Sequence, residues 1–226
     1  MGNVISLAER RASRSGSAHG AHGRLQRARA TFFFDVSSPW TYLAAERADR
    51  MFTALRWRPV LADALAGAEL VASPAVDDAR RAVEERAAAL RLPLVWPETW
   101  PNTGRSAMRV AALAAEQDRA APFVLAAGRL AFCGGYDIDD PETLAEAAAV
   151  AGIGLDEALA AARDHGRDAV LEREALRLIE HGADTLPALR VGRTLFCGEH
   201  RLAEASAAAS AVTVHRAARM TGARPA

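Results

Sequence analysis

The sequence contains no lysine, and all 28 basic residues of the 226-residue chain are arginines. This absence excludes a Schiff-base lysine, the lysine of a phosphate-binding P-loop and a lysine general base. The chain also has only two cysteines, Cys133 and Cys197, which lie far apart and fit no CxxC or metal-ligand spacing. We therefore expect neither a disulfide framework nor a metal site.

Long apolar runs and an excess of one charge are missing as well. No stretch approaches the ~18 consecutive apolar residues of a membrane span, and no apolar core follows the first basic residues as in a signal peptide. Because 28 acidic residues balance the 28 basic ones, the electrostatic footprint of a nucleic-acid binder is lacking. We expect a cytoplasmic protein that binds neither nucleic acid nor a membrane.

The two ends of the chain differ from its centre. Residues 1–29 are rich in Arg, Gly, Ser and His and poor in large apolar side chains, which predicts a disordered basic tail. Residues 213–226 are predicted to form a flexible C-terminal tail. Between the tails, a chain that is 50% hydrophobic can bury one substantial core.

The first ordered segment predicts a strand, a helix and a second strand. The aromatic run Thr31–Val36 is typical of a buried strand, and Ser37-Ser38-Pro39 ends it. Apolar residues at helical spacing follow, with Pro39 at the first helical position, where its missing N–H costs nothing. The segment Leu55–Leu61 predicts the second strand. A unit of this length is expected to be parallel and right-handed.

The middle of the chain, residues 79–182, is Ala-rich and predicts helices. The proline-rich segment Leu92–Pro101 predicts a rigid connection between them. Strands return at 187–191 and 194–196, joined by a tight turn, and a last helix begins near Glu199. The predicted order is βαβ…ββα, which is the α/β thioredoxin fold. Its halves, 30–78 and 183–212, flank an all-helical insertion domain at 79–182, as in the DsbA-like and kappa-type branch.

Three local motifs sharpen this fold prediction. The segment Phe34–Ala44 reads FDVSSPWTYLA and resembles the first-strand motif of the 2-hydroxychromene-2-carboxylate isomerases and kappa-class glutathione transferases. Thr185–Gly192 reads TLPALRVG and is similar to the cis-proline segment of that family, and Leu195–Leu202 is similar to its last hairpin and helix start. The resemblance runs over roughly residues 31–205.

The resemblance implies a glutathione-dependent isomerase or transferase that acts, as a homodimer, on a small conjugated or aromatic electrophile. It implies that Ser38 is the catalytic residue and donates a hydrogen bond to the thiolate of glutathione, with the helical insertion closing over the substrate. The thiolate would add reversibly to the substrate, a single bond would rotate, and elimination would return the cofactor. The other implied cofactor-binding residues are Pro39, Trp40, Asn102, Leu186, Pro187, Glu199 and His200, with Pro187 in the cis form.

The position of Ser38 has a physical meaning of its own. It lies where a strand ends and a helix begins, and the free N–H groups and the dipole of that first turn stabilise an anionic sulfur. In thioredoxin-like redox enzymes the first cysteine of CxxC occupies this place. Here the tetrad Ser38-Pro39-Trp40-Thr41 has oxygen at both sulfur positions, so this pair cannot perform thiol–disulfide exchange.

The sequence also departs from the family pattern. The loop Leu61–Gly67 lacks the Asn-Pro-Pro and the lysine that contribute to the glutathione site of the family. The acidic residue at the start of the last helix stands in the pair Glu199-His200, displaced by one position. Arg105 or Arg201 is a candidate carboxylate clamp if glutathione is held in a different way.

Each candidate residue also has a purely structural interpretation. Ser38 fits an ordinary helix N-cap before proline, and Pro187 fits a trans proline at the start of an edge strand. Asn102 fits an exposed N-cap. Trp40 and Tyr136 are candidates to line the site of an aromatic substrate, but both also fit partly buried packing residues. His181 is interpreted as a cation at a helix C-terminus.

Other functions stay open beside the glutathione hypothesis. The first is a non-redox binding module that keeps the fold, and a second is a redox protein that uses Cys197. A serine hydrolase is disfavoured because no G-x-S-x-G motif frames Ser38.

Overall fold

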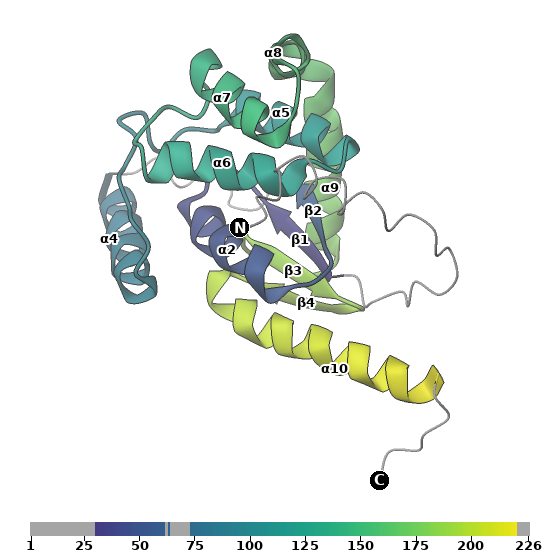
Figure 1. Cartoon of the computed structure of the whole chain (residues 1–226). Helices are drawn as coiled ribbons and strands as arrows, with labels where there is room; N and C mark the ends of the chain where they lie inside the picture. The colour runs from purple at the N-terminus through teal and green to yellow at the C-terminus, as the bar shows by residue number, and fades with distance from the viewer. Residues whose placement is uncertain (1–29, 62, 64–72, 221–226) are drawn as a thin grey trace, which may run out of the picture.

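The computed structural model describes residues 30–61, 63 and 73–220, so the predicted tail at 1–29 lies outside the described residues. A four-stranded mixed sheet with the order β2-β1-β3-β4 forms its centre (Figure 1). Strand β1 (Ala30–Phe34) is parallel to β2 (Leu55–Pro59) and antiparallel to β3 (Ala188–Val191), and β3 is antiparallel to β4 (Thr194–Cys197). This is the predicted thioredoxin-like order.

Strand β1 is covered on both faces, which explains its unbroken apolar sequence. Phe32 and Phe34 point into the larger core, where the ring of Trp57 meets both of them. Phe33 points to the opposite face and packs with Ala175 and Leu178 of α9 (Asp168–Glu180). The first strand ends two residues earlier than predicted because the chain turns at Asp35.

The helical insertion lies between β2 and β3. It consists of α4 (Ser73–Leu90), α5 (Arg105–Glu116), α6 (Ala120–Phe132), α7 (Pro141–Ala151), α8 (Leu155–Arg163), the short η2 (His165–Arg167) and α9. The first helix begins at Ser73, earlier than the predicted boundary at 79. Two apolar stripes of the insertion belong to the core: Val83 and Ala87 on α4, with Leu90 partly buried beside them, and Ala107, Val110, Ala111 and Ala114 on α5.

The last helix extends beyond its predicted end. After η3 (Glu199–Arg201), α10 runs over Leu202–Met220 and continues past the sheet (Figure 1). Residues 213–220 are therefore helical, and their assignment to a flexible tail is corrected. Alanines fill the preceding turns, and their high helix propensity lets the helix continue. Among the described residues, no helix combines the length and apolar character that crossing a membrane requires.

Candidate functional site

Ser38 is the N-cap residue of α2 (Pro39–Met51). Its carbonyl accepts hydrogen bonds from the amides of Thr41 (3.0 Å) and Tyr42 (3.3 Å), so the backbone enters the helix regularly. A serine N-cap usually also accepts a bond through its hydroxyl, but the Ser38 hydroxyl caps no amide of the described helix. The half-buried hydroxyl therefore lies beside the positive end of the helix dipole without a capping role.

The turn before Ser38 is fixed by Asp35, which is fully buried. The Asp35 carboxylate accepts hydrogen bonds from the amide and the hydroxyl of Ser37, at 2.9 and 2.7 Å. The Asp35 amide in turn donates to the hydroxyl of Thr41 at 3.3 Å. Thr41 stands at the position of the second redox cysteine and is 1% exposed. Its hydroxyl therefore forms a buried hydrogen bond within the protein.

The bond between Leu186 and Pro187 is cis, which confirms that prediction. Since Phe33 of β1 lies opposite Ala188 of β3, the residues just before Ala188 reach the same edge of the sheet at which β1 leaves toward Ser38. The carbonyl of Pro187 accepts a 2.8 Å hydrogen bond from the amide of Gly198. The cis-proline segment and the end of β4 are therefore fixed to each other at this edge.

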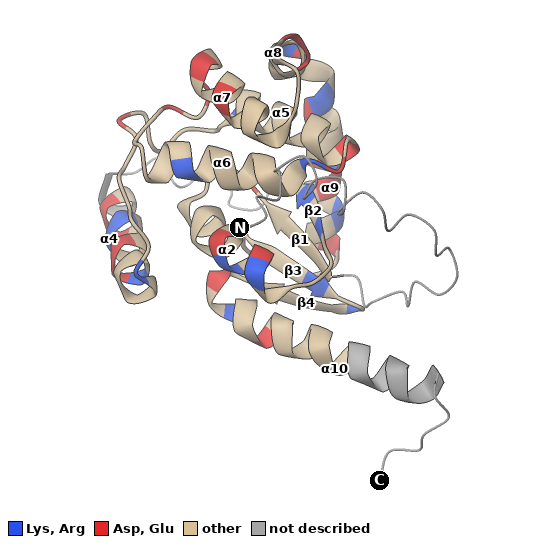
Figure 2. Cartoon of the chain, in the orientation of Figure 1, with Lys and Arg blue, Asp and Glu red and all other residues tan. Residues whose placement is uncertain are grey.

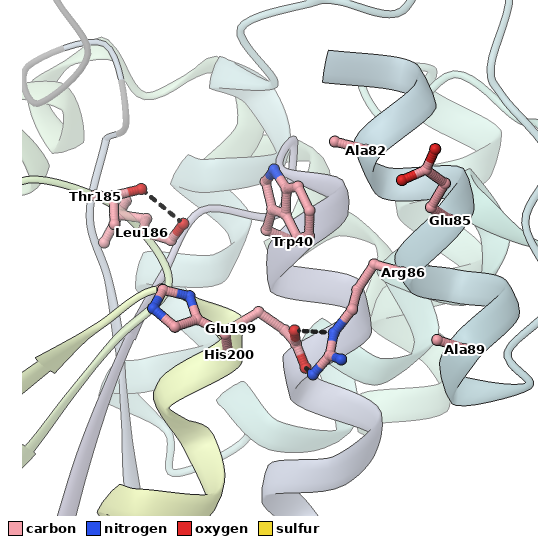
Figure 3. A pocket seen from close by; sticks show the side chains of 10 residues that line it. Trp40, Ala82, Glu85, Arg86, Ala89, Thr185, Leu186, Glu199 and His200 are labelled. Atoms are coloured by element: carbon pink, nitrogen blue, oxygen red, sulfur yellow. Dashed lines mark hydrogen bonds and ion pairs between the residues drawn. The ribbon is translucent and has the colours of Figure 1, made fainter. Parts of the chain in front are cut away.

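A cavity of about 480 Å³ opens beside this edge (Figure 3). One wall is Trp40 of α2, and another consists of Thr185, Leu186, Gly198, Glu199 and His200. The third wall is one face of α4, formed by Ala82, Glu85, Arg86 and Ala89. The volume lies within the range of about 300–1,000 Å³ that is usual for small-molecule sites.

Glu199 is the buried charge of this site, with 1% of its side chain exposed. Arg86 holds its carboxylate with two hydrogen bonds, Nε to Oε2 at 2.6 Å and an Nη to Oε1 at 3.2 Å. Arg47 of α2 forms a second ion pair with Oε1. The carboxylate raises the pKa of the Arg86 guanidinium above its ordinary value.

The structure brings together four predicted cofactor-binding residues, since Trp40, Leu186, Glu199 and His200 all line the cavity. Ser38, Pro39 and Pro187 are their immediate neighbours in sequence but do not themselves line this cavity of the described chain.

Asn102 lies elsewhere. Its amide donates to Asp137 at 3.2 Å, and it is not among the residues around the described cavity. The N-cap of α5 is Gly104, so the alternative interpretation of Asn102 as an N-cap is wrong.

The two candidate carboxylate clamps have partners within the protein. Arg105 contacts Asp63, Asp168 and Glu172, and Arg201 holds Glu204. Tyr136 is 57% exposed and does not line this described cavity. His181 lies at a helix C-terminus as expected, since it is the C-cap of α9.

The contribution of α4 to the site was not predicted from the sequence. Ala82, Glu85, Arg86 and Ala89 are spaced as one helical face beside the buried stripe of Val83 and Ala87. Acidic and basic residues mix along this helix (Figure 2), so the face looks like an ordinary solvated surface in the sequence. Arg86 meets a partner 113 residues away, and no local pattern signals such a contact.

Both cysteines are free thiols. Cys133 lies 3.1 Å from the hydroxyl of Tyr42. Cys197 packs with the smaller core, on the sheet face that α9 covers, and burial raises the pKa of its thiol. A raised pKa lowers the fraction of reactive thiolate.

Comparisons with known proteins agree with this architecture. The family model described as "DSBA-like thioredoxin domain" matches residues 30–209. No curated protein matches the sequence.

Solved structures share the fold at low sequence identity. A 2-hydroxychromene-2-carboxylate isomerase has a TM-score of 0.70 and 18% identity, over 84% of this chain and 98% of the other. A probable DsbA oxidoreductase from Streptomyces coelicolor has a TM-score of 0.63 and 21% identity, over 88% and 92%. The cytosolic disulfide reductase DsbM from Pseudomonas aeruginosa, solved with GSH, has a TM-score of 0.53 and 19% identity, over 83% and 98%.

Proposed function

The chain belongs to the DSBA-like thioredoxin domain family, and from this premise we propose that it is a glutathione-dependent isomerase or transferase. Its substrate would be a small, conjugated or aromatic electrophile. The observation that carries the proposal is the cavity itself, which joins Trp40, next to the α2 N-terminus, to Leu186 of the cis-proline segment.

The start of α2, next to the cavity wall formed by Trp40, fits the sulfur of a thiol ligand. Serine and threonine replace both cysteines of the redox tetrad, so the protein supplies no sulfur there. The hydroxyl of Ser38 is not used for capping within the described helix, and it can donate a hydrogen bond to a thiolate. The first-turn amides of α2 and the helix dipole favour the same negative charge.

The remaining walls suit a peptide-like thiol and an apolar substrate. The backbone of Leu186 directly precedes the cis proline and lies on the cavity wall, where an extended ligand main chain can pair with it. The indole of Trp40 offers an apolar surface to a conjugated ring. The face of α4 covers the third side.

Glutathione, when bound, would supply a nucleophilic thiolate that adds reversibly to the substrate. The task of Ser38 is then to hold this sulfur ionised through a charge-assisted hydrogen bond. The relative solved as a 2-hydroxychromene-2-carboxylate isomerase and the GSH-containing DsbM structure support the proposal by their shared fold.

Disulfide exchange is a weaker candidate, although two of the compared structures are oxidoreductases. It requires a reactive thiol at the end of β1, where this chain has Ser38. Cys197 offers no substitute because burial raises the pKa of its thiol. We therefore expect no insulin reduction that depends on Cys197, which a Cys197→Ser variant tests.

Isothermal titration calorimetry with reduced glutathione tests the proposal. We expect binding to the wild-type protein and an affinity about tenfold or more lower for Ser38→Ala, since one hydrogen bond to a charged group is lost. Ser210→Ala, which removes an exposed hydroxyl of α10, is the matched control and should bind like the wild type. The proposal is contradicted if none of the three proteins binds glutathione, or if all three bind it with equal affinity.

A further inference from the structure

One carboxylate connects three separate segments of the chain. Glu199 is the first residue of η3, Arg47 belongs to α2 and Arg86 belongs to α4 of the helical insertion. Both arginines form ion pairs with Glu199. This triad, formed by Arg47, Arg86 and the buried Glu199, joins the insertion to the thioredoxin-like core at the cavity.

The hydrogen-bonding capacity of Glu199 is largely used inside the triad. Oε1 accepts from both arginines, and Oε2 accepts from Nε of Arg86. The Glu199 side chain is 1% exposed, whereas those of Arg47 and Arg86 are 22% and 34% exposed. A buried carboxylate is stable only when it is paired, and here the pairing comes from the protein.

Arg86 is the side chain of α4 that crosses to the core at this point. The neighbouring positions on the same face, Ala82 and Ala89, end in methyl groups, and Figure 3 shows Arg86 extending from the helix to Glu199. Glu85 points away from this contact in the same view. The adjacent, buried stripe of α4 packs the helix against the core through Val83 and Ala87. The Arg86–Glu199 contact therefore connects this face of α4 to the thioredoxin-like core.

The triad also has a net positive charge, because two guanidinium groups surround one carboxylate. An ammonium group placed beside it would be repelled by both arginines, and it would have to displace one of them to reach Glu199. The triad is therefore unsuited to binding the ammonium group of a ligand.

We propose that Glu199 is a positioning residue that fixes α4 over the cavity through Arg86 and Arg47, and that it does not bind the ammonium group of glutathione. The statement on the ligand rests on the proposed function, whereas the statement on α4 does not. The two parts are therefore tested by different measurements.

Hydrogen exchange tests the position of α4 in the ligand-free protein. In Arg86→Met we expect the amides of residues 82–89 to exchange about tenfold faster, since a charge-assisted contact is lost, while amides of α9 keep their rates. Arg86→Lys retains the charge and should restore part of the protection. Arg81→Met, at an exposed position of the same helix, is the matched control and should leave the rates unchanged.

A second variant removes the shared carboxylate. Glu199→Gln should give the same local acceleration in α4, and Glu204→Gln, which breaks an exposed ion pair with Arg201, should not. If Glu199→Gln fails to fold, the arginine variants decide alone. Unchanged exchange of residues 82–89 in Arg86→Met overturns the proposal, whether or not glutathione binds.

Calorimetry with two probes tests the ligand. Wild-type protein should bind glutathione and its N-acetylated form, which lacks the ammonium group, within about threefold of each other. Binding of glutathione together with a loss of about tenfold or more for the N-acetylated form overturns the proposal and leaves the proposed function intact. If neither probe binds, the proposed function fails, and the exchange rates of α4 alone decide on the triad.

Discussion

The amide of Gly198 donates a 2.8 Å hydrogen bond to the carbonyl of Pro187. This bond fixes the cis-proline segment to the residues that begin η3, so that Leu186 on one side and Glu199 and His200 on the other keep their places around the cavity. Gly198 has φ +88° and ψ 151°, a conformation that is open to glycine almost alone.

Replacing this glycine should therefore damage both stability and the site. In Gly198→Ala we expect a loss of about 1–3 kcal/mol in the free energy of unfolding from backbone strain. The added Cβ would also lie 2.7 Å from the ring of His200, which must move. Urea denaturation measures the first effect and glutathione calorimetry the second.

Gly182→Ala is the control for this prediction. Gly182 has φ +90°, but no described atom outside its chain neighbours lies within 4 Å of the added Cβ. It should lose stability through strain and keep the ligand affinity of the wild type. If Gly198→Ala were as stable as the wild type, the strain predicted for residue 198 would be contradicted.

Ser38 and Asp140 both precede a proline at the first position of a helix, but their side chains differ in use. Asp140 accepts hydrogen bonds from the amides of Glu142 and Thr143, whereas the Ser38 hydroxyl caps no amide of the described α2. We expect Asp140→Ala to lose about 1 kcal/mol of unfolding free energy and Ser38→Ala to lose less than about 0.5 kcal/mol. Thermal denaturation of the two variants side by side gives the comparison, and equal losses would assign Ser38 a structural role.

A buried ion pair in the insertion should make stability depend on pH. Arg109, 5% exposed, holds Asp168 with two hydrogen bonds of 2.7 Å, and these bonds lower the pKa of the Asp168 carboxyl. Because this pKa is lower in the folded than in the unfolded state, the stabilisation is complete above about pH 4 and is lost as the pH falls further.

The variant Asp168→Asn tests this assignment. At neutral pH we expect it to lose about 3 kcal/mol of unfolding free energy, because Arg109 is left buried without its counter-charge. The difference from the wild type should narrow when urea denaturation is repeated below about pH 4. A difference that stays constant with pH would mean that the charge of Asp168 does not stabilise the fold.

The succession of strands and helices along the chain and the start of α2 could be predicted because their signals are local. The aromatic run of β1, Pro39 at the first helical position and the turn between β3 and β4 each fix one element within a few residues. The identity of Ser38 and Thr41 likewise showed from the sequence alone that the tetrad carries no thiol for disulfide exchange.

The third wall of the cavity could not be predicted in this way. Ala82 and Ala89 carry no polar signal. The role of Arg86 depends on its ion pair with Glu199, which lies 113 residues further along the chain. The end of α10 was missed for a different reason, since the β-branched residues Val212 and Thr213 reduce local helix propensity although the helix continues to Met220. Long-range contacts and the continuation of a preceding helix both lie outside a local pattern.

A crystal structure of the protein soaked with reduced glutathione tests the central claim most directly. The account predicts electron density for the ligand in the cavity, with its sulfur within hydrogen-bonding distance of the Ser38 hydroxyl and its main chain paired with the backbone of Leu186. Ligand density elsewhere on the protein, or a sulfur that points away from Ser38, would contradict it.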